Sequence, residues 1–450
     1  MSDKYHTMLT SHIRRPTQVY KSNRLPLEKS FRLYRKARGI IPAMSQTFSK
    51  APSSYVEGVY PIYLSKGYRG HVFDVDNNRY IDYVMALGPI SLGYNYPAVN
   101  AAIKKQLRNG ISFSMPHSLE LELSEEIQSI IPGAEMVRFS KTGSDAGTAT
   151  IRVARALTKR DKIAYCGSGG VWHDWFTALT SRNDGVPKFN NKLIRKFSYN
   201  DLESLKILFE EWKGEIAAVY IEPMTTEYPK DNFLHKVKKM AHQNGSILIF
   251  DEVVTGFRLA NGGAQELLEI EADLVAFGKG IGNGMPLGAI TGKVEYMEKF
   301  NDVFYSTSYG GETLSLAAGV AVINEFKTKP VIKHCWKIGS HLQDQFNKIA
   351  KELEVNISLD GIPVRSSISC RDQNGNDSLL IKSLFCQEAV QRGVLFGRGY
   401  VMLCYTHTQK DIENTINVCE TSMKKVKEAI QNNSVKKSLK GKIMRPVLTF

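Results

Sequence analysis

Short apolar runs alternate with longer amphipathic stretches through the middle of this chain, and this alternation restricts its fold more than any other feature. The runs that predict strands lie at residues 136–140, 163–165, 217–221, 247–250, 274–277 and 289–291. The stretches between them, such as 145–157 and 234–243, have the pattern of helices. Strands that alternate with helices predict an α/β fold, in which helices cover both faces of a mostly parallel sheet.

The two ends of the chain have a different pattern. Residues 70–83 predict two strands joined by an Asp-Asn-Asn turn. After residue 325 the pattern predicts a helix, strands near 363–370 and 394–404, and a final helix near 411–430. We therefore expect a large domain at residues 76–325 and a smaller α+β domain at 326–450, to which residues 1–75 contribute.

Composition excludes several classes of function. The 450 residues include six cysteines without a CxxC pair and ten histidines without an HExxH motif, so we expect a reducing, cytoplasmic location and no metal site. No apolar run is long enough to span a bilayer. Much of the net charge of +14 lies in residues 1–38 and 424–450. Basic ends can bind nucleic acid or an anionic membrane, but solvated helix faces explain them as well, and we expect neither partner.

Lys279 is the first candidate for chemistry. It follows the apolar run 274–277 and has a glycine on each side. A lysine at a desolvated strand end can have a lowered pKa and act as an amine nucleophile toward an aldehyde. A pyridoxal phosphate Schiff base requires such an amine. A solvated surface lysine is the alternative that this position alone would favour.

Other polar residues follow predicted strands in the same way. Asp251 follows 247–250, Glu222 follows 217–221, and the turn Thr142-Gly143-Ser144 follows 136–140. Ligands collect outside the carboxyl ends of strands in α/β sheets. Asp251 can pair with a protonated pyridine nitrogen, and a helix that begins at the turn can hold a phosphate. Ordinary helix capping is the alternative for each of these residues taken alone.

The order of these motifs resembles the class III pyridoxal phosphate aminotransferases, and most closely the branch of glutamate-1-semialdehyde 2,1-aminomutase. The motifs are Thr-Gly-Ser-Asp-Ala at 142–146, Trp-His at 172–173, Glu-Pro at 222–223, Asp-Glu-Val-Val-Thr-Gly-Phe-Arg at 251–258 and Gly-Lys-Gly-Ile-Gly-Asn-Gly-Met-Pro-Leu-Gly at 278–288. The resemblance extends from about Leu33 to the C-terminal helix. It implies the fold type I of pyridoxal phosphate-dependent transferases, and a homodimer with active sites at the subunit interface.

The resemblance also implies roles for single residues. By position, Lys279 forms the Schiff base, Asp251 pairs with the ring nitrogen, and Glu222 matches an active-site glutamate behind the cofactor. Trp172 takes the place of an aromatic residue that stacks on the pyridine ring, although core packing is the alternative for this side chain. The remaining cofactor-binding positions are Thr142, Gly143, Ser144, His173 and Val253, with Ser308, or Thr307 beside it, reaching the phosphate from the partner subunit.

Three departures separate the chain from the aminomutase. Lys50, in the segment that also holds Thr47, replaces an arginine that binds the substrate carboxylate, and lysine lacks the flat fork of a guanidinium. The loop at 181–187 is shorter than the gating loop of the aminomutase, and the segment 397–403 lacks an acidic residue. Thr47, Lys50 and Arg398 are our candidates for substrate binding.

A shorter loop favours release of the first product, which a transaminase needs and a mutase must prevent. We therefore predict an aminotransferase that moves an amino group from an amino acid, with glutamate as the expected donor, to an aldehyde or ketone. The acceptor can be a sugar, a sugar nucleotide or another metabolite. The alternatives are an intramolecular aminomutase, racemase or decarboxylase chemistry on the same cofactor, and a noncatalytic protein that binds nucleic acid.

Overall fold

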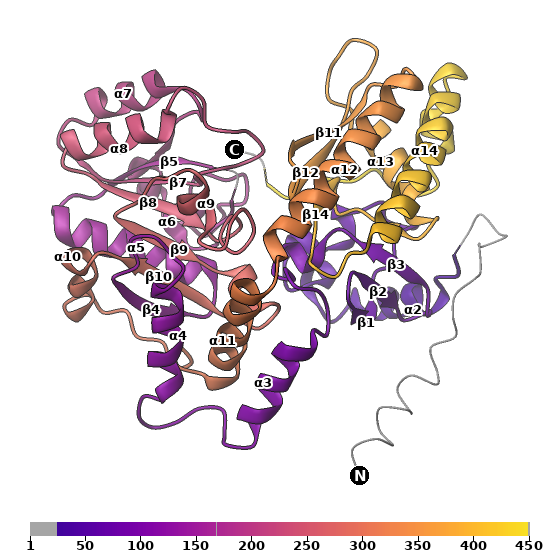
Figure 1. The fold of residues 1–450 in the computed structure, drawn as a ribbon. Coiled ribbons are helices and arrows are strands. Elements are labelled where there is room, and N and C mark those ends of the chain that lie inside the picture. The colour runs from indigo at the N-terminus through magenta and orange to yellow at the C-terminus, as the bar shows by residue number, and fades with distance from the viewer. Residues whose placement is uncertain (1–24, 168, 449–450) are drawn as a thin grey trace.

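A seven-stranded sheet forms the centre of the larger lobe of the molecule (Figure 1). The computed structural model describes residues 25–167 and 169–448, so most of the basic N-terminal segment lies outside the described residues. The strand order in the sheet is β4-β10-β9-β8-β7-β5-β6. The strands are β4 (Met136–Ser140), β5 (Lys162–Cys166), β6 (Ile194–Lys196), β7 (Ile216–Ile221), β8 (Ile247–Glu252), β9 (Leu274–Phe277) and β10 (Gly288–Gly292).

The sheet is mostly parallel, as the alternating pattern predicts. Only β10 runs antiparallel to its neighbours, β4 and β9, while the pairings among β9, β8, β7, β5 and β6 are parallel. All six predicted strands are confirmed. The edge strand β6 was not predicted, because it has three residues and two of them are exposed.

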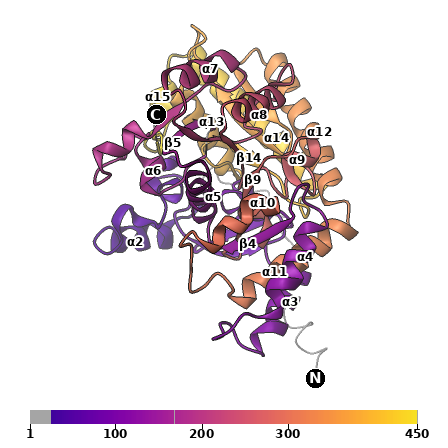
Figure 2. The same ribbon diagram turned by 90° about the vertical axis from the view of Figure 1, so that its left-hand side faces the viewer.

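Helices cover both faces of this sheet, because alternate side chains of its buried strands enter two separate cores. Val219 and Ile221 of β7 pack in one core with side chains of α7 and α8, and Ala218 and Tyr220 pack in the other with α5. On the α7 side, α3, α4 and α11 lie side by side (Figures 1 and 2). The helices of this lobe are α3 (Pro97–Leu107), α4 (Ser118–Gln128), α5 (Gly143–Thr158), α6 (Asp174–Thr177), α7 (Leu202–Glu211), α8 (Phe233–Gln243), α9 (Gly263–Leu267), α10 (Val294–Met297) and α11 (Thr313–Thr328).

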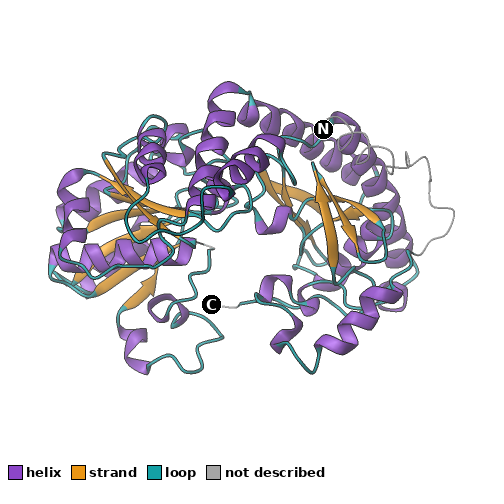
Figure 3. Ribbon diagram, turned by 90° about the horizontal axis from the view of Figure 1, so that it is seen from below, coloured by secondary structure: helices purple, strands orange, loops and turns teal. Residues whose placement is uncertain are grey.

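The smaller lobe combines both ends of the described chain, and Figure 3 shows strands in each lobe. One sheet of this lobe has the order β1-β2-β3-β13, and the other has the order β11-β12-β14. The core of the lobe contains side chains from both ends of the chain, with residue 25 the first and residue 444 the last. The predicted strand pair at 70–83 is confirmed as β2 and β3, whereas the predicted strand at 394–404 is broken into β13 and β14. The elements are α2 (Glu28–Ala37), β1 (Leu64–Tyr68), β2 (His71–Asp74), β3 (Arg79–Asp82), α12 (Val331–Glu352), β11 (Ile357–Ile362), β12 (Arg365–Cys370), α13 (Leu379–Val390), β13 (Val394–Leu395), β14 (Tyr400–Met402), α14 (Gln409–Gln431) and α15 (Val435–Ser438).

The described residues lack a membrane-spanning helix and a metal-binding cluster. None of their helices combines the length and the apolar composition that crossing a bilayer requires. No group of three or more His, Cys, Asp or Glu side chains among them is placed to hold a metal ion.

Candidate active site

The candidate residues of the sequence meet at one edge of the larger sheet. Glu222, Asp251 and Lys279 lie at or just after the carboxyl ends of β7, β8 and β9, which are consecutive in the sheet. β4 is related to β9 through two antiparallel pairings, so it runs in the same direction as β9. The turn at Thr142 therefore opens at the same edge, where ligands of parallel sheets collect.

Lys279 is partly buried beside this edge. Burial lowers the pKa of its amine to about 8, and the negative charge of Asp251 opposes this effect. Glycines make room around it: a Cβ atom at Gly88 would lie 3.4 Å from Lys279 Cδ, and one at Gly278 would lie 3.3 Å from the backbone of Gly143. A desolvated amine of lowered pKa therefore lies at this edge of the sheet, with Gly88 packed beside it.

Asp251 is 8% exposed and has a donor on each carboxylate oxygen. The Tyr220 hydroxyl donates to Oδ2 at 3.0 Å, and the Val253 N–H donates to Oδ1 at 3.1 Å. Burial raises the pKa of Asp251 to about 6, with a further rise from the negative charge of Glu222. Sequence analysis did not select Tyr220, although a tyrosine within the otherwise aliphatic run 216–221 was a visible signal.

Helix α5 begins at the turn that the sequence indicated. Thr142 is its N-cap and forms a capping box with Asp145, with hydrogen bonds of 3.1 and 2.9 Å. A Cβ atom at Gly143 would lie only 2.5 Å from Val253 Cγ1, so only glycine fits there. The first N–H groups of a 16-residue helix have no partner within the helix, and they attract an anion. Ser144 adds a hydroxyl in this first turn.

Trp172 and His173 both contact α5, Trp172 through its backbone and His173 through its side chain. The backbone N–H of Trp172 donates to Ser144 Oγ at 3.4 Å, whereas Trp172 itself is 69% exposed. His173 Nδ1 lies 2.5 Å from the Thr148 hydroxyl, and its Nε2 lies 3.5 Å from the Asp145 carboxylate. The ring nitrogens of His173 therefore contact α5.

Glu222 forms a buried ion pair with Arg365, which sequence analysis missed. Arg365 Nη1 lies 2.5 Å from Glu222 Oε1 and also donates to the Met224 carbonyl at 3.2 Å. Arg365 begins β12 in the smaller lobe, 143 residues along the chain. The only signal in the sequence was a charged residue within the predicted strand at 363–370.

Arg258 also connects distant segments beside Lys279. This buried arginine donates to the Gly88 carbonyl at 2.5 Å and to the Leu403 carbonyl at 3.2 Å. It belongs to the Asp-Glu-Val-Val-Thr-Gly-Phe-Arg motif, but nothing in that motif identifies its hydrogen-bond partners. Arg258 thereby holds two segments, around residues 88 and 403, against the larger sheet.

Four of the remaining candidates lie on the surface, and the fifth, Arg398, is half-buried. Thr47 and Lys50 are exposed in the N-terminal segment, and Thr307 and Ser308 are exposed in the loop before α11. Arg398 lies between two glycines in the connection from β13 to β14, and its φ angle of +44° is rare for a residue with a side chain. None of these five side chains is part of the cluster at the edge of the sheet.

Comparisons with known proteins agree with this geometry. The family model described as "Aminotransferase class-III" matches residues 54–422. The 3-aminobutyryl-CoA aminotransferase of Cloacimonas acidaminovorans is 32% identical over 420 residues, which are 91% of this chain and 100% of that protein. The glutamate-1-semialdehyde 2,1-aminomutase of Acetivibrio thermocellus is 33% identical over 422 residues, which are 87% of this chain and 97% of that protein.

A solved structure extends the comparison to the fold. The FumI protein of Sphingopyxis sp. MTA144, solved in its PLP internal aldimine form, superimposes with a TM-score of 0.85 at 23% identity. The superposition covers 93% of this chain and 99% of that chain. At this level of identity, the similarity establishes the shared fold.

Proposed function

This chain belongs to the class III aminotransferases, which are pyridoxal phosphate enzymes of fold type I, and we propose that it transfers an amino group from glutamate to an aldehyde or ketone. The observation that carries the proposal is the meeting of Lys279, Asp251 and the first turn of α5 at one edge of the sheet. An intramolecular aminomutase is the second candidate, because a relative of that activity is 33% identical.

The residues at the sheet edge fit the cofactor in three respects. A buried carboxylate requires a cationic partner, a glycine-lined helix start accepts a phosphate, and a lysine of lowered pKa presents an amine. Pyridoxal phosphate supplies an aldehyde that bonds to amines and a protonated ring that accepts the electron pair released from a substrate carbon. We assign Lys279 to the aldehyde, Asp251 to the ring nitrogen, and Gly143 and Ser144 to the phosphate.

The same proposal extends to the neighbouring residues. Thr142 fixes the start of α5, and Val253 packs against Gly143, so both would support the turn that holds the phosphate. Trp172 and His173 lie beside Ser144 and α5, and we assign both to the cofactor side of the site. We also propose that most of residues 76–325 form the cofactor-binding domain and that residues 1–75 and 326–450 form the smaller domain, with β3 on the side of the smaller domain and the end of α11 on the side of the larger one.

With the cofactor bound, Lys279 would also act as the proton-transfer base. Its neutral Nζ would take the proton from the substrate carbon that bears the amine and deliver it to the cofactor carbon that receives the amine. A pKa near the working pH suits both directions of this transfer, and burial lowers the pKa of Lys279 to about 8. Glu222 and Arg365 act through their charges, because Glu222 raises the pKa of Asp251 while Arg365 lowers that of Lys279.

Loop length favours the aminotransferase over the aminomutase. The segment 181–187 is short and exposed, apart from a half-buried Val186. A short loop covers little of a bound intermediate, so the first product can leave. Arg398 and Lys50, with Thr47 beside Lys50, are the residues that we propose for binding the acceptor.

The absorption spectrum tests this function. We expect the purified protein with pyridoxal phosphate to be yellow, to bleach when glutamate alone is added, and to form one 2-oxoglutarate per site. Glutamate 1-semialdehyde is the matched probe for the second candidate. Formation of 5-aminolevulinate from it, without bleaching by glutamate, would replace our proposal with the aminomutase.

We also propose a homodimer whose interface completes the active site. Two neighbouring surface segments carry exposed apolar side chains: Phe113, Met115 and Leu121 on one, and Phe304 and Tyr309 on the other. The Thr313 N–H donates to the Ile111 carbonyl at 2.9 Å, which joins the segments into one surface. A second copy would cover these side chains and bring its own Thr307 and Ser308 to the phosphate.

Mixed dimers test this arrangement. We expect Lys279→Ala to be inactive, and the double variant Thr307→Glu with Ser308→Glu to be inactive because its charges repel the phosphate. Co-expression of the two variants should restore about a quarter of wild-type activity, since random pairing gives half of the dimers one intact site. A dimer that stays inactive after mixing would place the two residues in the site of their own chain.

A further inference from the structure

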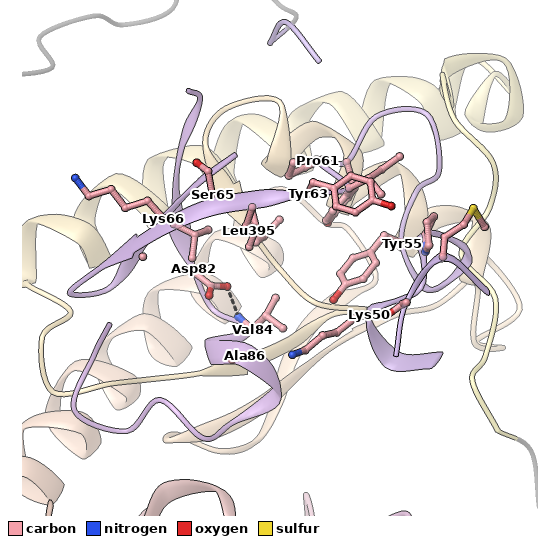
Figure 4. Close-up of a pocket in the computed structure, with 18 of the residues that line it drawn as sticks. Lys50, Tyr55, Pro61, Tyr63, Ser65, Lys66, Asp82, Val84, Ala86 and Leu395 are labelled. Atoms are coloured by element: carbon pink, nitrogen blue, oxygen red, sulfur yellow. Dashed lines mark hydrogen bonds between the residues drawn. The ribbon is translucent and has the colours of Figure 1, made fainter. Parts of the chain in front are cut away.

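A cavity of about 610 Å³ lies between the N-terminal segment and the sheet of β1, β2, β3 and β13 (Figure 4). Its walls include Lys50, Tyr55, Tyr63, Ala86 and Leu395. Resting on the aminotransferase function proposed above, we infer that this cavity receives the body of the amino acceptor, and that the acceptor is an anionic carbonyl compound with a flat, largely apolar body. Volume, proximity, backbone strain and charge support this inference.

The cavity approaches the reacting lysine through one short turn. Ala86 lines the cavity, and Gly88, two residues further on, packs against Lys279. Two residues of chain span at most about 7 Å. Arg258 holds the Gly88 carbonyl, so the turn cannot move away from Lys279 without losing this hydrogen bond. A molecule whose carbonyl meets Lys279 can therefore extend its body past Ala86 into the cavity.

Backbone strain gathers around the same cavity. Met44 and Ala86, on two of its walls, have φ angles of +58° and +55°. Arg398 has a φ angle of +44°. It lies close enough to Tyr55 for its positive charge to oppose the rise that burial causes in the pKa of Tyr55. Left-handed conformations are unfavourable for residues with side chains, and they cluster where a ligand site has to be shaped.

The walls suit a flat and apolar body. The rings of Tyr55 and Tyr60 lie 5.2 Å apart between their centroids. The hydroxyl of Tyr60 donates to the Phe396 carbonyl at 3.0 Å, and that of Tyr94 donates to Asp82 at 2.7 Å. Because protein atoms already accept these hydrogen bonds, Tyr60 and Tyr94 offer mainly their rings to a ligand, whereas the buried Tyr63 hydroxyl has no partner among the described residues and can bond to a polar group of the ligand. The volume is that of a site for a drug-sized molecule.

The charges around the cavity favour an anion. The Asp82 carboxylate accepts hydrogen bonds from Tyr94 and from the Val84 N–H, and Glu57 pairs with Lys442. The Lys50 side chain runs below Tyr55 toward Ala86 (Figure 4). The ion pairs found among the described residues, such as those of Lys141, Arg365 and Lys442, do not include Lys50. A lysine binds a carboxylate or a phosphoryl group as a point charge, so either group satisfies this cation.

The test uses the amino form of the holoenzyme, which glutamate generates, and follows its reoxidation by four aldehydes. The aldehydes are 4-carboxybenzaldehyde, 4-formylphenyl phosphate, neutral 4-methoxybenzaldehyde, and short succinate semialdehyde. We expect one or both charged aromatic aldehydes to react with a kcat/KM about tenfold or more above that of the other two. Whichever charged aldehyde is preferred identifies the carboxylate or the phosphoryl group as the natural one. Lys50→Met should lower kcat/KM for the preferred charged aldehyde about tenfold. The kcat/KM for the neutral aldehyde should stay the same.

A variant that fills the cavity provides the second arm. Leu64 lines the cavity and is 48% exposed, so Leu64→Trp narrows the space with little risk to folding. Leu64→Trp should slow the reactions with the aromatic aldehydes about tenfold. The rates of the glutamate step and of the reaction with succinate semialdehyde should stay unchanged. Leu379→Trp is the matched control, because Leu379 is 45% exposed and does not line the cavity.

The outcomes separate the two levels of the proposal. If glutamate fails to produce the amino form in the wild-type protein, the proposed function itself is wrong. If the glutamate step is normal, the inference is overturned when the charged aromatic aldehydes have no advantage. It is also overturned when Leu64→Trp slows the glutamate step as much as the aromatic aldehydes, or when Leu379→Trp has the same effect as Leu64→Trp.

Discussion

Replacing Lys279 with alanine is expected to lower kcat by at least about 10⁴-fold, because one amine serves as both the nucleophile and the proton-transfer base. Pyridoxal phosphate should still bind through Asp251 and the first turn of α5, but without a covalent bond. The measurements are the steady-state rate with glutamate, and the mass of the protein after borohydride reduction, which should show no added cofactor. Lys293→Ala is the matched control, since Lys293 is a partly buried lysine directly after β10, and it should stay within about twofold of wild type.

The same lysine predicts a pH dependence. Burial lowers the pKa of Lys279 to about 8, so the ammonium form dominates below that pH and the neutral amine above it. Covalent capture of pyridoxal phosphate by the cofactor-free protein should therefore accelerate as the pH rises and level off above about 8. A rate that keeps rising toward pH 10.5, the ordinary pKa of a lysine amine, would show that the Lys279 amine is not desolvated. Turnover retained by Lys279→Ala would contradict the whole assignment.

Replacing Asp251 with asparagine is expected to lower kcat by about 10²- to 10³-fold, the usual effect of removing one preorganised electrostatic partner. The amide keeps the shape of the carboxylate and loses its charge, so the cofactor ring would no longer be held in its protonated form. Asp251→Glu should recover part of the loss. Stopped-flow absorbance with glutamate separates this effect on chemistry from any change in KM.

A substitution at Tyr220 removes one hydrogen bond to Asp251 and keeps its charge, so its effect should be smaller than that of Asp251→Asn. Tyr220→Phe removes only the hydroxyl that donates to Asp251 Oδ2, and we expect a loss of about tenfold in kcat together with a shift in the pH at which the bound cofactor changes its spectrum. Tyr165→Phe is the control, because that buried hydroxyl donates to the Gly169 carbonyl and not to Asp251. Equal losses in both tyrosine variants would indicate damage to packing, and an unchanged rate in Asp251→Asn would remove Asp251 from the mechanism.

Much of the larger lobe was predictable because its signal is local. A buried parallel strand is a short apolar run, and the predicted strand at 274–277 has the bounds of β9. Chemistry collects at the carboxyl ends of such strands, so residues after the runs were identifiable as candidates before their positions in space were known. Where the local signal was weak, prediction failed: β6 is short and largely exposed, and the run at 394–404 is interrupted at Gly397 and Gly399.

The contacts that complete the site carry no local signal. Arg365 meets Glu222 across 143 residues, and Arg258 meets Gly88 across 170 residues and Leu403 across 145. The sequence shows a charged residue in each case, but nothing in its spacing names the partner. The proposed limits of the domains, and the roles assigned to the site residues, stay predictions until the variants described above are made.

The family, the order of the strands along the chain and the residue types at the strand ends can be read from the amino acids alone, because each depends on a short contiguous motif or on apolar periodicity. Folding sets which of those residues are close together, which donors hold Asp251, and where a cavity opens beside Ala86. These depend on how segments far apart in the chain pack against each other. Packing is set by the sum of many weak contacts, and no single stretch of sequence encodes that sum.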